Sequence, residues 1–413
     1  MTYEETLQYI HSVSWRGSRL GLHRVQELCA RLGDPQKQLR CVHIAGTNGK
    51  GSVSAMLASI FRHAGMRMGL FTSPYVYAFN ERMQIDGEPI SDDALTEIVE
   101  ALRPHADAME DPPTEFELIT VAAFLWFAKE QCDIVVLEAG LGGRLDATNV
   151  IESPAAAVIT GIGLDHTDAL GSTTAEIAAE KAGILKRGCP VILGECDDEA
   201  REVIRDAAVA AGAVLYPTDV RPVRILEATL EGTKFAVDWR RYETNLLGVY
   251  QPKNAAVAIR TAQVLGMGEE DIRAGVAQVR WPARFEILQR EPLIIFDGGH
   301  NPQGVSTAVE TVRALLPGKV DLVTGVMADK DYEAIAENLS AIVENVWCVT
   351  PDNPRSLSAE DYVAVFVRAG IPATPAATVA EGVRLARAHA ESTGRPLLIL
   401  GSLYLYKEVR DAL

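Results

Sequence analysis

Short apolar, β-branched runs alternate with helical stretches along the first half of the chain. The predicted strands are residues 41–45, 68–72, 133–138 and 156–160. The predicted helices are residues 52–63, 116–129, 174–185 and 199–211. Continuous apolar strands are typical of parallel sheets covered by helices on both faces, and their alternation with helices is the βαβ pattern. The sequence therefore predicts an α/β fold that begins with a doubly wound, mostly parallel sheet.

A second alternation follows a short change of pattern. Residues 223–239 alternate like antiparallel strands, and residues 254–265 resume as a helix. New strands are expected at 293–296, 320–324, 346–349 and 397–400, with helices at 303–316 and 359–368 among those between them. A chain of 413 residues is long enough for two domains. We place the boundary near Arg290, which gives domains 1–290 and 291–413, the second a smaller Rossmann-like α/β domain.

Composition narrows the class of protein. The formal charge of −17 argues against non-specific binding to nucleic acid or to anionic membranes. The apolar stretch 119–128 is too short to span a bilayer and is expected to be a buried helix. The six cysteines form no CxxC motif and no metal-ligand spacing. Scattered thiols of this kind indicate reduced core residues in a cytoplasmic protein.

The segment GTNGKGS, residues 46–52, follows a predicted strand and opens a predicted helix. This is the context of a P-loop, in which backbone N–H groups, the helix N-terminus and a lysine surround a phosphate. The match to GxxxxGK[ST] is imperfect because Gly51 stands between Lys50 and Ser52. The segment predicts a nucleotide site, and the alternative is an ordinary glycine-rich turn.

Polar residues follow several predicted strands, at the sheet edge where doubly wound folds bind ligands. Ser73, Glu138 and the pair Asp165 and His166 could hold Mg²⁺ or water, although histidine is a softer ligand than Mg²⁺ prefers. The alternatives are a carboxylate that caps a glycine loop at Glu138 and an ordinary loop histidine at His166.

Three further positions carry open alternatives. By composition alone, Lys181 is a solvated lysine on the helix 174–185. Asp297 and His300 follow a predicted strand and are either ligand contacts or part of an Asx-turn and helix cap. Ser402 also follows a strand, and for it a simple helix cap is the favoured interpretation.

Together the motifs resemble the folylpolyglutamate synthetase family, relatives of the Mur ligases. In chain order they are GTNGKGS (46–52), TSPY (72–75), FNERM (79–83), TEFE (114–117), LEAGLGGRLDATN (137–149), LDHTDALG (164–171), EKAGI (180–184), YQPKNA (250–255), PARFE (282–286) and DGGHNP (297–302). FNERM, TEFE and LGGRLDATN are similar to the folate branch rather than to the Mur ligases. The resemblance implies an ATP-binding Mur-ligase-like domain followed by a C-terminal glutamate-ligase domain.

The resemblance also implies roles for individual residues. The ATP contacts would be Thr47, Asn48, Gly49, Lys50, Gly51, Ser52, Asn254, Arg284 and Asp297. Ser73, Glu138 and His166 would hold Mg²⁺. The pterin or folate side would be formed by Thr114, Glu115, Phe116, Glu117, Leu145, Asp146 and Ala147. His300 and Ser402 would bind glutamate; Lys50, Lys181 and His300 would be catalytic, with Lys181 carbamylated.

The implied activity is ATP- and Mg²⁺-dependent addition of L-glutamate to a folate through an acyl phosphate, and also to dihydropteroate to make dihydrofolate. The expected partners are small molecules only, and a monomer is expected.

The chain departs from the family pattern at Tyr250, where histidine is common, at Ala283, where glycine is common, and at Gly299, where alanine is common. The alternatives are a Mur-type ligase acting on a UDP-linked peptide and a P-loop switch that hydrolyses nucleotide without ligation.

Overall fold

The computed structural model describes residues 1–13, 17, 19–218 and 222–413. The chain divides into two compact units, Met1–Val223 with Lys253–Val279, and Arg224–Pro252 with Arg280–Leu413. This division differs from the expected boundary near Arg290. The difference arises because the segment 224–252 belongs with the second unit and because β12 (Glu286–Arg290) pairs with β13 (Leu293–Asp297) as the edge of the second sheet.

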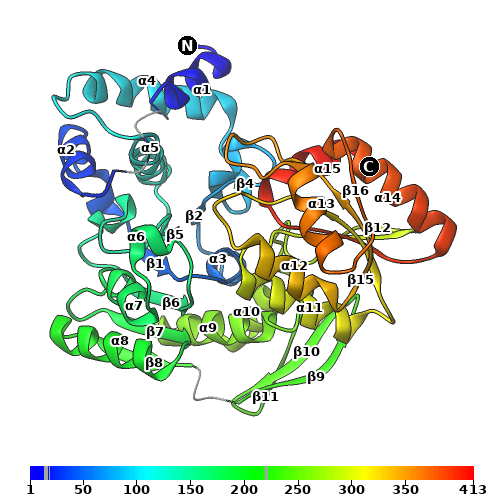
Figure 1. Ribbon diagram of the computed structural model, residues 1–413. Helices are drawn as coiled ribbons and strands as arrows, with labels where there is room; N and C mark the ends of the chain where they lie inside the picture. Colours follow the sequence, from blue (N-terminus) through cyan, green and yellow to red (C-terminus); the bar gives the residue numbers. More distant parts are fainter. Residues whose placement is uncertain (14–16, 18, 219–221) are drawn as a thin grey trace. The chain divides into compact units, whose positions relative to one another are not determined.

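The first unit is built on an eight-stranded sheet in the order β4-β3-β2-β5-β1-β6-β7-β8 (Figure 1). Its strands are β1 (Cys41–Ala45), β2 (Met68–Phe71), β3 (Met83–Ile85), β4 (Glu88–Pro89), β5 (Ile134–Glu138), β6 (Ala156–Gly161), β7 (Pro190–Glu195) and β8 (Val214–Pro217). Neighbours from β2 to β8 pair in parallel, and β3 and β4 form an antiparallel edge. The prediction of a doubly wound, mostly parallel sheet is confirmed.

Helices surround this sheet. They are α1 (Tyr3–His11), α2 (His23–Arg31), α3 (Lys50–His63), α4 (Asp92–Asp107), α5 (Glu115–Lys129), α6 (Thr167–Leu170), α7 (Thr174–Ala182), α8 (Asp198–Ala211), α9 (Gln251–Val264) and α10 (Glu269–Ala277), with 3₁₀ turns at Pro35–Gln38, Phe79–Arg82 and Ala147–Val150. The helix α3, which opens at the glycine-rich segment, is buried continuously from Gly51 to Phe61. Its small residues, including Ser54, Ala55 and Ala58, allow neighbouring elements to approach on every side.

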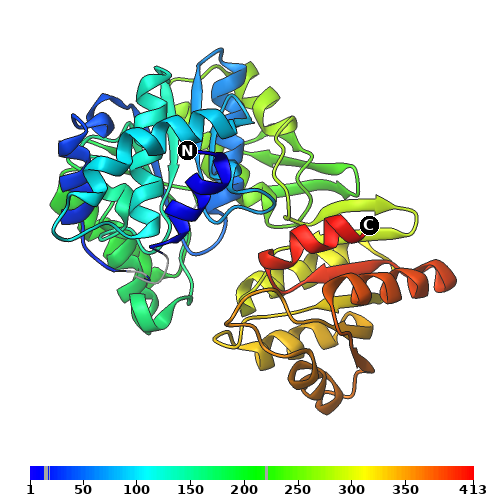
Figure 2. The ribbon, with the colours of Figure 1, turned by 90° about the horizontal axis from the view of Figure 1, so that it is seen from above.

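The second unit has a six-stranded sheet in the order β12-β13-β17-β14-β15-β16, parallel except at β12. The remaining strands are β14 (Val320–Thr324), β15 (Val343–Cys348), β16 (Ala373–Pro375) and β17 (Leu397–Leu400). The helices are α11 (Pro302–Leu315), α12 (Tyr332–Ser340), α13 (Ala359–Arg368), α14 (Val379–Thr393) and α15 (Tyr406–Ala412), with a 3₁₀ turn at Leu403–Leu405. Figure 2 shows α15 (red) and the helices α12 and α13 (orange to brown) on opposite sides of these strands.

The antiparallel strands expected over residues 223–239 are also present. They form a separate three-stranded sheet in the order β11-β10-β9, which consists of β9 (Val223–Thr229), β10 (Gly232–Val237) and β11 (Arg240–Thr244). The short strands β3, β4, β8 and β16 and the strand β7 were not predicted. Three of these have four residues or fewer with exposed or half-buried side chains, so they lack the apolar run that identifies a central strand.

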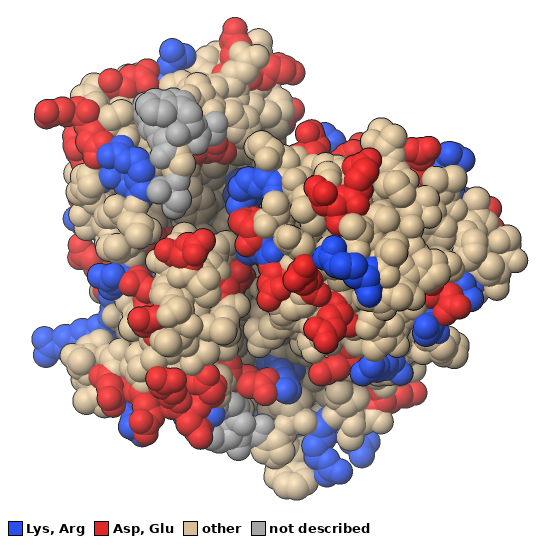
Figure 3. Space-filling model, viewed as in Figure 1, with Lys and Arg blue, Asp and Glu red and all other residues tan. Residues whose placement is uncertain are grey.

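The surface reflects the negative charge of the chain. Acidic side chains gather at the lower left of Figure 3, where Figure 1 places α8. This helix carries Asp198, Glu199, Glu202 and Asp206 as exposed residues. No helix within the described ranges is both long enough and apolar enough to cross a bilayer.

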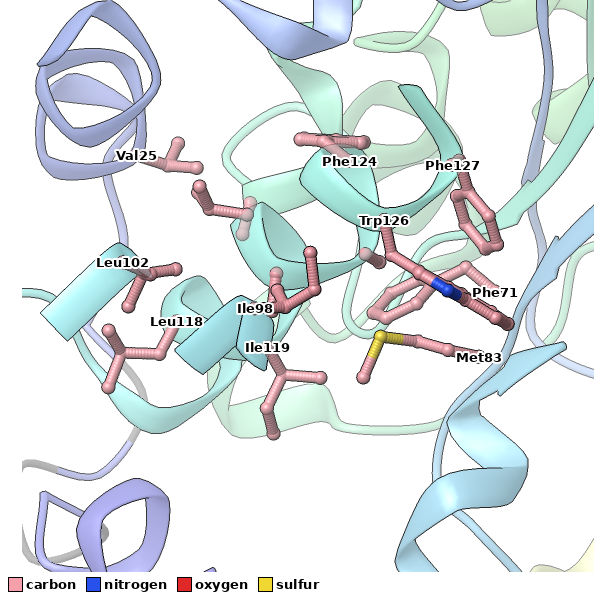
Figure 4. Packing of buried hydrophobic residues seen from close by; sticks show 14 of the residues in the cluster. Val25, Phe71, Met83, Ile98, Leu102, Leu118, Ile119, Phe124, Trp126 and Phe127 are labelled. Carbon is pink, nitrogen blue, oxygen red and sulfur yellow. The ribbon is translucent and has the colours of Figure 1, made fainter. Parts of the chain in front are cut away.

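The helix α5 forms the centre of an apolar core in the first unit. Figure 4 shows Leu118, Ile119, Phe124 and Phe127 of this helix packed among side chains from α2, α4 and the strands β2 and β3. The stretch 119–128 is therefore the buried helix that its composition predicts.

The contact between α3 and α10 depends on Gly275. A Cβ atom at this position would lie 2.5 Å from Ile60 Cα and 2.6 Å from Ile60 N, so the two helix backbones touch. We predict that Gly275→Ala lowers the free energy of unfolding by about 1–3 kcal/mol through overpacking, although alanine is the better helix former. Chemical denaturation would measure this. The exposed change Glu270→Ala on the same helix should stay within about 0.5 kcal/mol, and a stabilised Gly275→Ala protein would contradict the close approach.

Candidate functional site

The glycine-rich segment joins the central strand β1 to α3. Gly49 has φ of 86°, a left-handed conformation that favours glycine, and it occupies the N-cap position of α3. A glycine cap has no side chain to accept the first N–H groups of the helix, so these groups remain suited to an anion. A Cβ atom on Gly49 would lie 2.5 Å from Asn254 Oδ1, so Asn254 of α9 lies directly over the loop.

Hydrogen bonds from the end of β6 brace this loop. Thr160 Oγ1 donates to Asn48 O at 2.7 Å, and Thr47 N donates to Gly161 O at 2.8 Å. The Thr47 hydroxyl lies 3.0 Å from Gly163 O and 3.1 Å from Gly163 N. Lys50 Nζ donates to the loop's own carbonyls, Gly46 O at 2.9 Å and Thr47 O at 3.3 Å. The ATP residues predicted in the first unit, from Thr47 to Ser52 and Asn254, therefore belong to one ordered structure.

The predicted metal ligands follow neighbouring strands at the same sheet edge. Glu138 is the last residue of β5, is only 3% exposed and pairs in register with Ile44 of β1. Ser73 follows β2, the other neighbour of β5. His166 follows β6, is exposed and has φ of 50° at the N-cap position of α6. Glu138 and His166 therefore follow the two strands that flank β1, and Ser73 follows the next strand beyond β5.

The chemistry of this donor set fits Mg²⁺. A buried carboxylate and a hydroxyl are hard oxygen donors of the kind Mg²⁺ takes, and His166 is the softer member. Across the residues that the structure describes, no group of three His, Cys, Asp or Glu side chains could hold a metal ion. A cation at this edge therefore needs the Ser73 hydroxyl and oxygens from phosphate or water in addition to Glu138.

Lys181 is not a solvated lysine, and the interpretation from composition was wrong. Its side chain lies inside the first unit on α7 and is only 2% exposed. Burial lowers the pKa of Lys181 to about 7, and the positive charge of Lys50 adds to this shift, against the opposing effect of Asp165 and Asp146. A buried amine that is partly neutral at pH 7 can act as a nucleophile, which an exposed lysine does poorly.

The two predicted pterin-side segments lie next to each other. Thr114 caps α5, and the ring of Phe116 on its first turn lies against Gly140, where a Cβ atom would be 2.6 Å from Phe116 Cζ. Asp146 holds the loop that contains Gly140. Its carboxylate accepts hydrogen bonds from Leu141 N at 2.8 Å, Thr148 N at 3.0 Å and Thr148 Oγ1 at 2.5 Å. Burial raises the pKa of Asp146.

A buried histidine behind this loop was not singled out from the sequence. His43 of β1 is fully buried, and its Nε2 lies 2.8 Å from Thr148 Oγ1. Because the Thr148 hydroxyl donates to Asp146, His43 Nε2 donates to Thr148. Burial lowers the pKa of His43 to about 3, so the imidazole is neutral and continues the chain of hydrogen bonds to Asp146. Only the position of His43 in an apolar strand, where a polar residue is costly, could have indicated it.

In the second unit, Asp297 ends β13 and organises the segments around it. It accepts hydrogen bonds from Phe285 N at 2.9 Å, Gly299 N at 2.8 Å and Tyr250 Oη at 3.3 Å. Burial raises the pKa of Asp297, while the charge of Arg284 opposes that shift. Arg284 lies between two residues with positive φ, Ala283 and Phe285. Tyr250, where the family commonly has histidine, therefore contacts Asp297, a predicted ATP-binding residue, directly.

The remaining predicted residues of this unit lie at adjacent strand ends. Asp297 pairs in register with Leu400 of β17, and Ser402 follows that strand. Ser402 Oγ accepts from Tyr404 N at 3.2 Å, which is the cap that its position predicts. His300 Nδ1 lies 2.9 Å from Gly298 O and therefore donates to it. Asp297 Oδ1 accepts from Gly299 N and so forms an Asx-turn, and Asn301 caps α11. The structural alternative for this segment is therefore present, and a ligand role for Asp297 and His300 stays a prediction.

Family models match both halves of the chain. Residues 44–262 match the Mur ligase middle domain, and residues 283–403 match the Mur ligase glutamate ligase domain. The chain is 36% identical to the dihydrofolate synthase/folylpolyglutamate synthase of Bacillus subtilis, over 100% of this chain and 99% of that protein. It is 37% identical to the folylpolyglutamate synthase of Lacticaseibacillus casei with the same coverage.

Solved structures agree with these relatives. The Mycobacterium tuberculosis folylpolyglutamate synthase complexed with ADP and AMPPCP superimposes with a TM-score of 0.92 at 29% identity, covering 99% of this chain and 98% of that one. The Escherichia coli FolC protein in complex with DHPP and ADP gives a TM-score of 0.87 at 31% identity, covering 100% and 97%. The chain belongs to the folylpolyglutamate synthase/dihydrofolate synthase family of Mur-type ligases.

Proposed function

We propose that this protein is an ATP- and Mg²⁺-dependent ligase that joins L-glutamate to the carboxylate of a folate. The observation that carries the proposal is the braced phosphate loop, which has the buried carboxylate Glu138 on the neighbouring strand and the buried amine Lys181 in the same unit. A P-loop switch would explain the phosphate loop alone. Family membership and the aromatic pterin-side wall at Phe116 favour the ligase.

The reaction follows from the weakness of a carboxylate as an electrophile. An oxygen of the folate carboxylate attacks the γ-phosphorus of ATP, the bond to ADP breaks, and an acyl phosphate forms. The amino group of glutamate then attacks the acyl carbon, loses a proton and expels inorganic phosphate. Lys50 of the phosphate loop neutralises charge on the phosphoryl group as it transfers. A divalent cation held by Ser73, Glu138 and His166 would supply further charge neutralisation.

A second substrate, dihydropteroate, is proposed for the same site. Phe116 is half-buried and lies against Gly140, and its ring centroid is 6.0 Å from that of the fully buried Phe71, so the Phe116 ring forms an ordered aromatic wall. Thr114, Glu115 and Glu117 flank it in sequence, and the predicted residues Leu145, Asp146 and Ala147 lie next to the Gly140 loop that Asp146 holds. A pterin ring can stack on such a wall whether or not a first glutamate is attached. Several relatives carry both activities in their names.

Glutamate is proposed to bind at His300 and Ser402. His300 Nδ1 donates to Gly298 O, which fixes the orientation of the imidazole ring at the strand end that also carries Asp297. A protein of this kind needs only small-molecule substrates. We propose a cytoplasmic monomer with no nucleic-acid or membrane partner, in line with the acidic surface.

The decisive assay is mass spectrometry of products formed from ATP, L-glutamate and either tetrahydrofolate or dihydropteroate. We expect a glutamylated product and ADP release that depends on glutamate. Lys50→Ala should lower the rate by about 100- to 1,000-fold or more, because it removes the charge at the phosphate loop. Glutamate-independent ADP release would favour a switch, and a product formed only from a UDP-linked peptide would favour a Mur-type ligase.

Replacing Glu138 by glutamine tests the metal site. The side chain keeps its size and loses its charge, so we expect the Mg²⁺ concentration for half-maximal activity to rise by about 10- to 100-fold. Activity titrated against Mg²⁺ would measure this. Glu97→Gln on α4 is a matched control, because that carboxylate is exposed and pairs only with Lys129 among the ion pairs of the described residues. An unchanged Mg²⁺ requirement in Glu138→Gln would remove Glu138 from the metal site.

Lys181 gives a prediction about pH and carbon dioxide. The folded pKa of about 7 lies below the ordinary value of 10.5, so between these pH values the unfolded chain holds a proton that the folded chain lacks. In CO₂-free buffer, the contribution of Lys181 to stability should therefore rise with pH above 7, by at most about 1.4 kcal/mol per pH unit. Denaturation at several pH values would detect this, and Lys181→Met should lose it.

The same amine should react with carbon dioxide. We expect ¹³C-bicarbonate to give a carbamate signal by ¹³C NMR in the wild-type protein and none in Lys181→Met. Equal signals in the two proteins would place the modification elsewhere.

A further inference from the structure

A buried ion pair joins α2 to the first turn of α5. Arg24 is only 2% exposed and Glu117 only 3%. Arg24 Nε lies 3.1 Å from Glu117 Oε1 and 3.0 Å from Oε2, and Arg24 Nη2 lies 3.0 Å from Oε1. Because the planar guanidinium contacts both carboxylate oxygens, it fixes the orientation of the Glu117 carboxylate as well as its position.

Glu117 also holds the start of α5. Its Oε2 accepts from Thr114 N at 2.7 Å, and Glu117 N donates to Thr114 Oγ1 at 3.4 Å, which together form a capping box. Both carboxylate oxygens are therefore engaged within the protein. Although Glu117 belongs to the pterin-side motif, it has no oxygen left outside these contacts to recognise a substrate well.

The residue placed by this arrangement is Phe116. It lies in the same first turn as Glu117, and its ring lies against Gly140 with so little space that no Cβ could be added there. A shift or rotation of the first turn of α5 would move this ring along the loop that Asp146 holds. The position of the aromatic wall therefore depends on the orientation of Glu117.

The other end of the guanidinium holds the segment before α2. Arg24 Nη2 donates to Arg19 O at 2.7 Å, and Arg24 Nη1 lies 3.4 Å from Asp111 Oδ2. Asp111 also binds Arg19 Nη1 at 2.9 Å and His23 Nε2 at 2.9 Å. Hydrogen bonds from His23 and the two arginines hold the pKa of Asp111 well below its usual range, so the cluster stays charged at neutral pH. One side chain thus connects the segment 19–23 to the turn that carries Phe116.

The pair is not needed merely to hold the helices together. Val25 of α2 and Leu118 of α5, the neighbours of Arg24 and Glu117, already belong to one apolar core (Figure 4). A buried ion pair rarely stabilises a fold more than apolar residues of the same size would, because both charges lose their hydration. The ion pair instead fixes the orientation of the first turn of α5 relative to α2, which apolar packing between the same helices does not do.

We propose that Arg24 is a positioning residue for folate recognition, which acts through Glu117 to fix Phe116 and the segment 19–23 without touching the substrate. The inference rests on the proposed function, and it identifies a substrate-specific role for a residue far from the phosphate loop in sequence. It assigns Glu117 to the support of the pterin-side wall rather than to direct contact with the ring.

Arg24→Lys tests this role, because lysine keeps the charge and loses the planar fork. We expect the KM for dihydropteroate or tetrahydrofolate to rise by about 10- to 100-fold, as small misplacements of a site do. The KM for ATP should stay within about twofold. Glu117→Gln should act in the same direction. Arg31→Lys, on the same helix, is the matched control, since Arg31 makes an exposed ion pair with Glu27.

A parallel rise in the KM for ATP, or equal effects of Arg24→Lys and Arg31→Lys, would overturn the proposal in favour of a general structural role. Amide hydrogen exchange supplies a second readout. Arg24→Lys should speed exchange in residues 115–121, whereas Arg31→Lys should not. A wild-type protein that glutamylates no folate would refute the proposed function itself, and unchanged exchange in Arg24→Lys would then refute the positioning role by a separate measurement.

Discussion

The brace between the end of β6 and the phosphate loop is the contact on which the first unit's site depends. Thr160 and Gly161 bond to the backbone of Asn48 and Thr47, so a loop that would otherwise be free to move is part of the sheet edge. Because β1 is central, its loop is flanked by the ends of β5 and β6. Sheet order brings Glu138 to the side of the loop, and the contacts of the Thr47 hydroxyl with Gly163 add the segment that leads to His166.

The sequence predicted most strands that pack in the interior and missed the short ones near the edges; the interior strand β7, between β6 and β8, is the exception. Fully buried parallel strands such as β1, β5 and β14 read as unbroken apolar runs, so their positions were visible. The edge strands β4 and β16 have two or three residues with mostly exposed side chains, and only their pairing identifies them. The two compact units depart from the predicted boundary near Arg290 in part for the same reason, because β12 joins the second sheet through an antiparallel edge pairing that has no local sequence pattern.

Candidate site residues were visible where they followed strands. Lys50, Glu138 and Asp297 could be proposed from strand ends, since doubly wound sheets bind ligands at that edge. Lys181 could not, because its helix has the composition of an exposed one and only the fold shows that its amine is buried. Arg24 was invisible for a different reason. Its partner lies 93 residues away, and nothing in a single sequence connects an arginine in one helix with a glutamate in another.

The buried polar groups of the first unit share one physical property. Each of Lys181, Asp146 and the pair of Arg24 and Glu117 has lost its hydration, which disfavours the charged state unless fixed partners replace water. Asp146 and Glu117 have backbone N–H partners, so their positions are as fixed as the backbone itself. For Lys181, burial and, to a smaller extent, the charge of Lys50 lower the pKa of the amine. Groups of the first kind hold loops and helix ends in place, whereas a group of the second kind is reactive. Buried carboxylates with backbone hydrogen-bond partners therefore hold this site in shape, whereas Lys181, whose pKa is lowered, is the buried group suited to react.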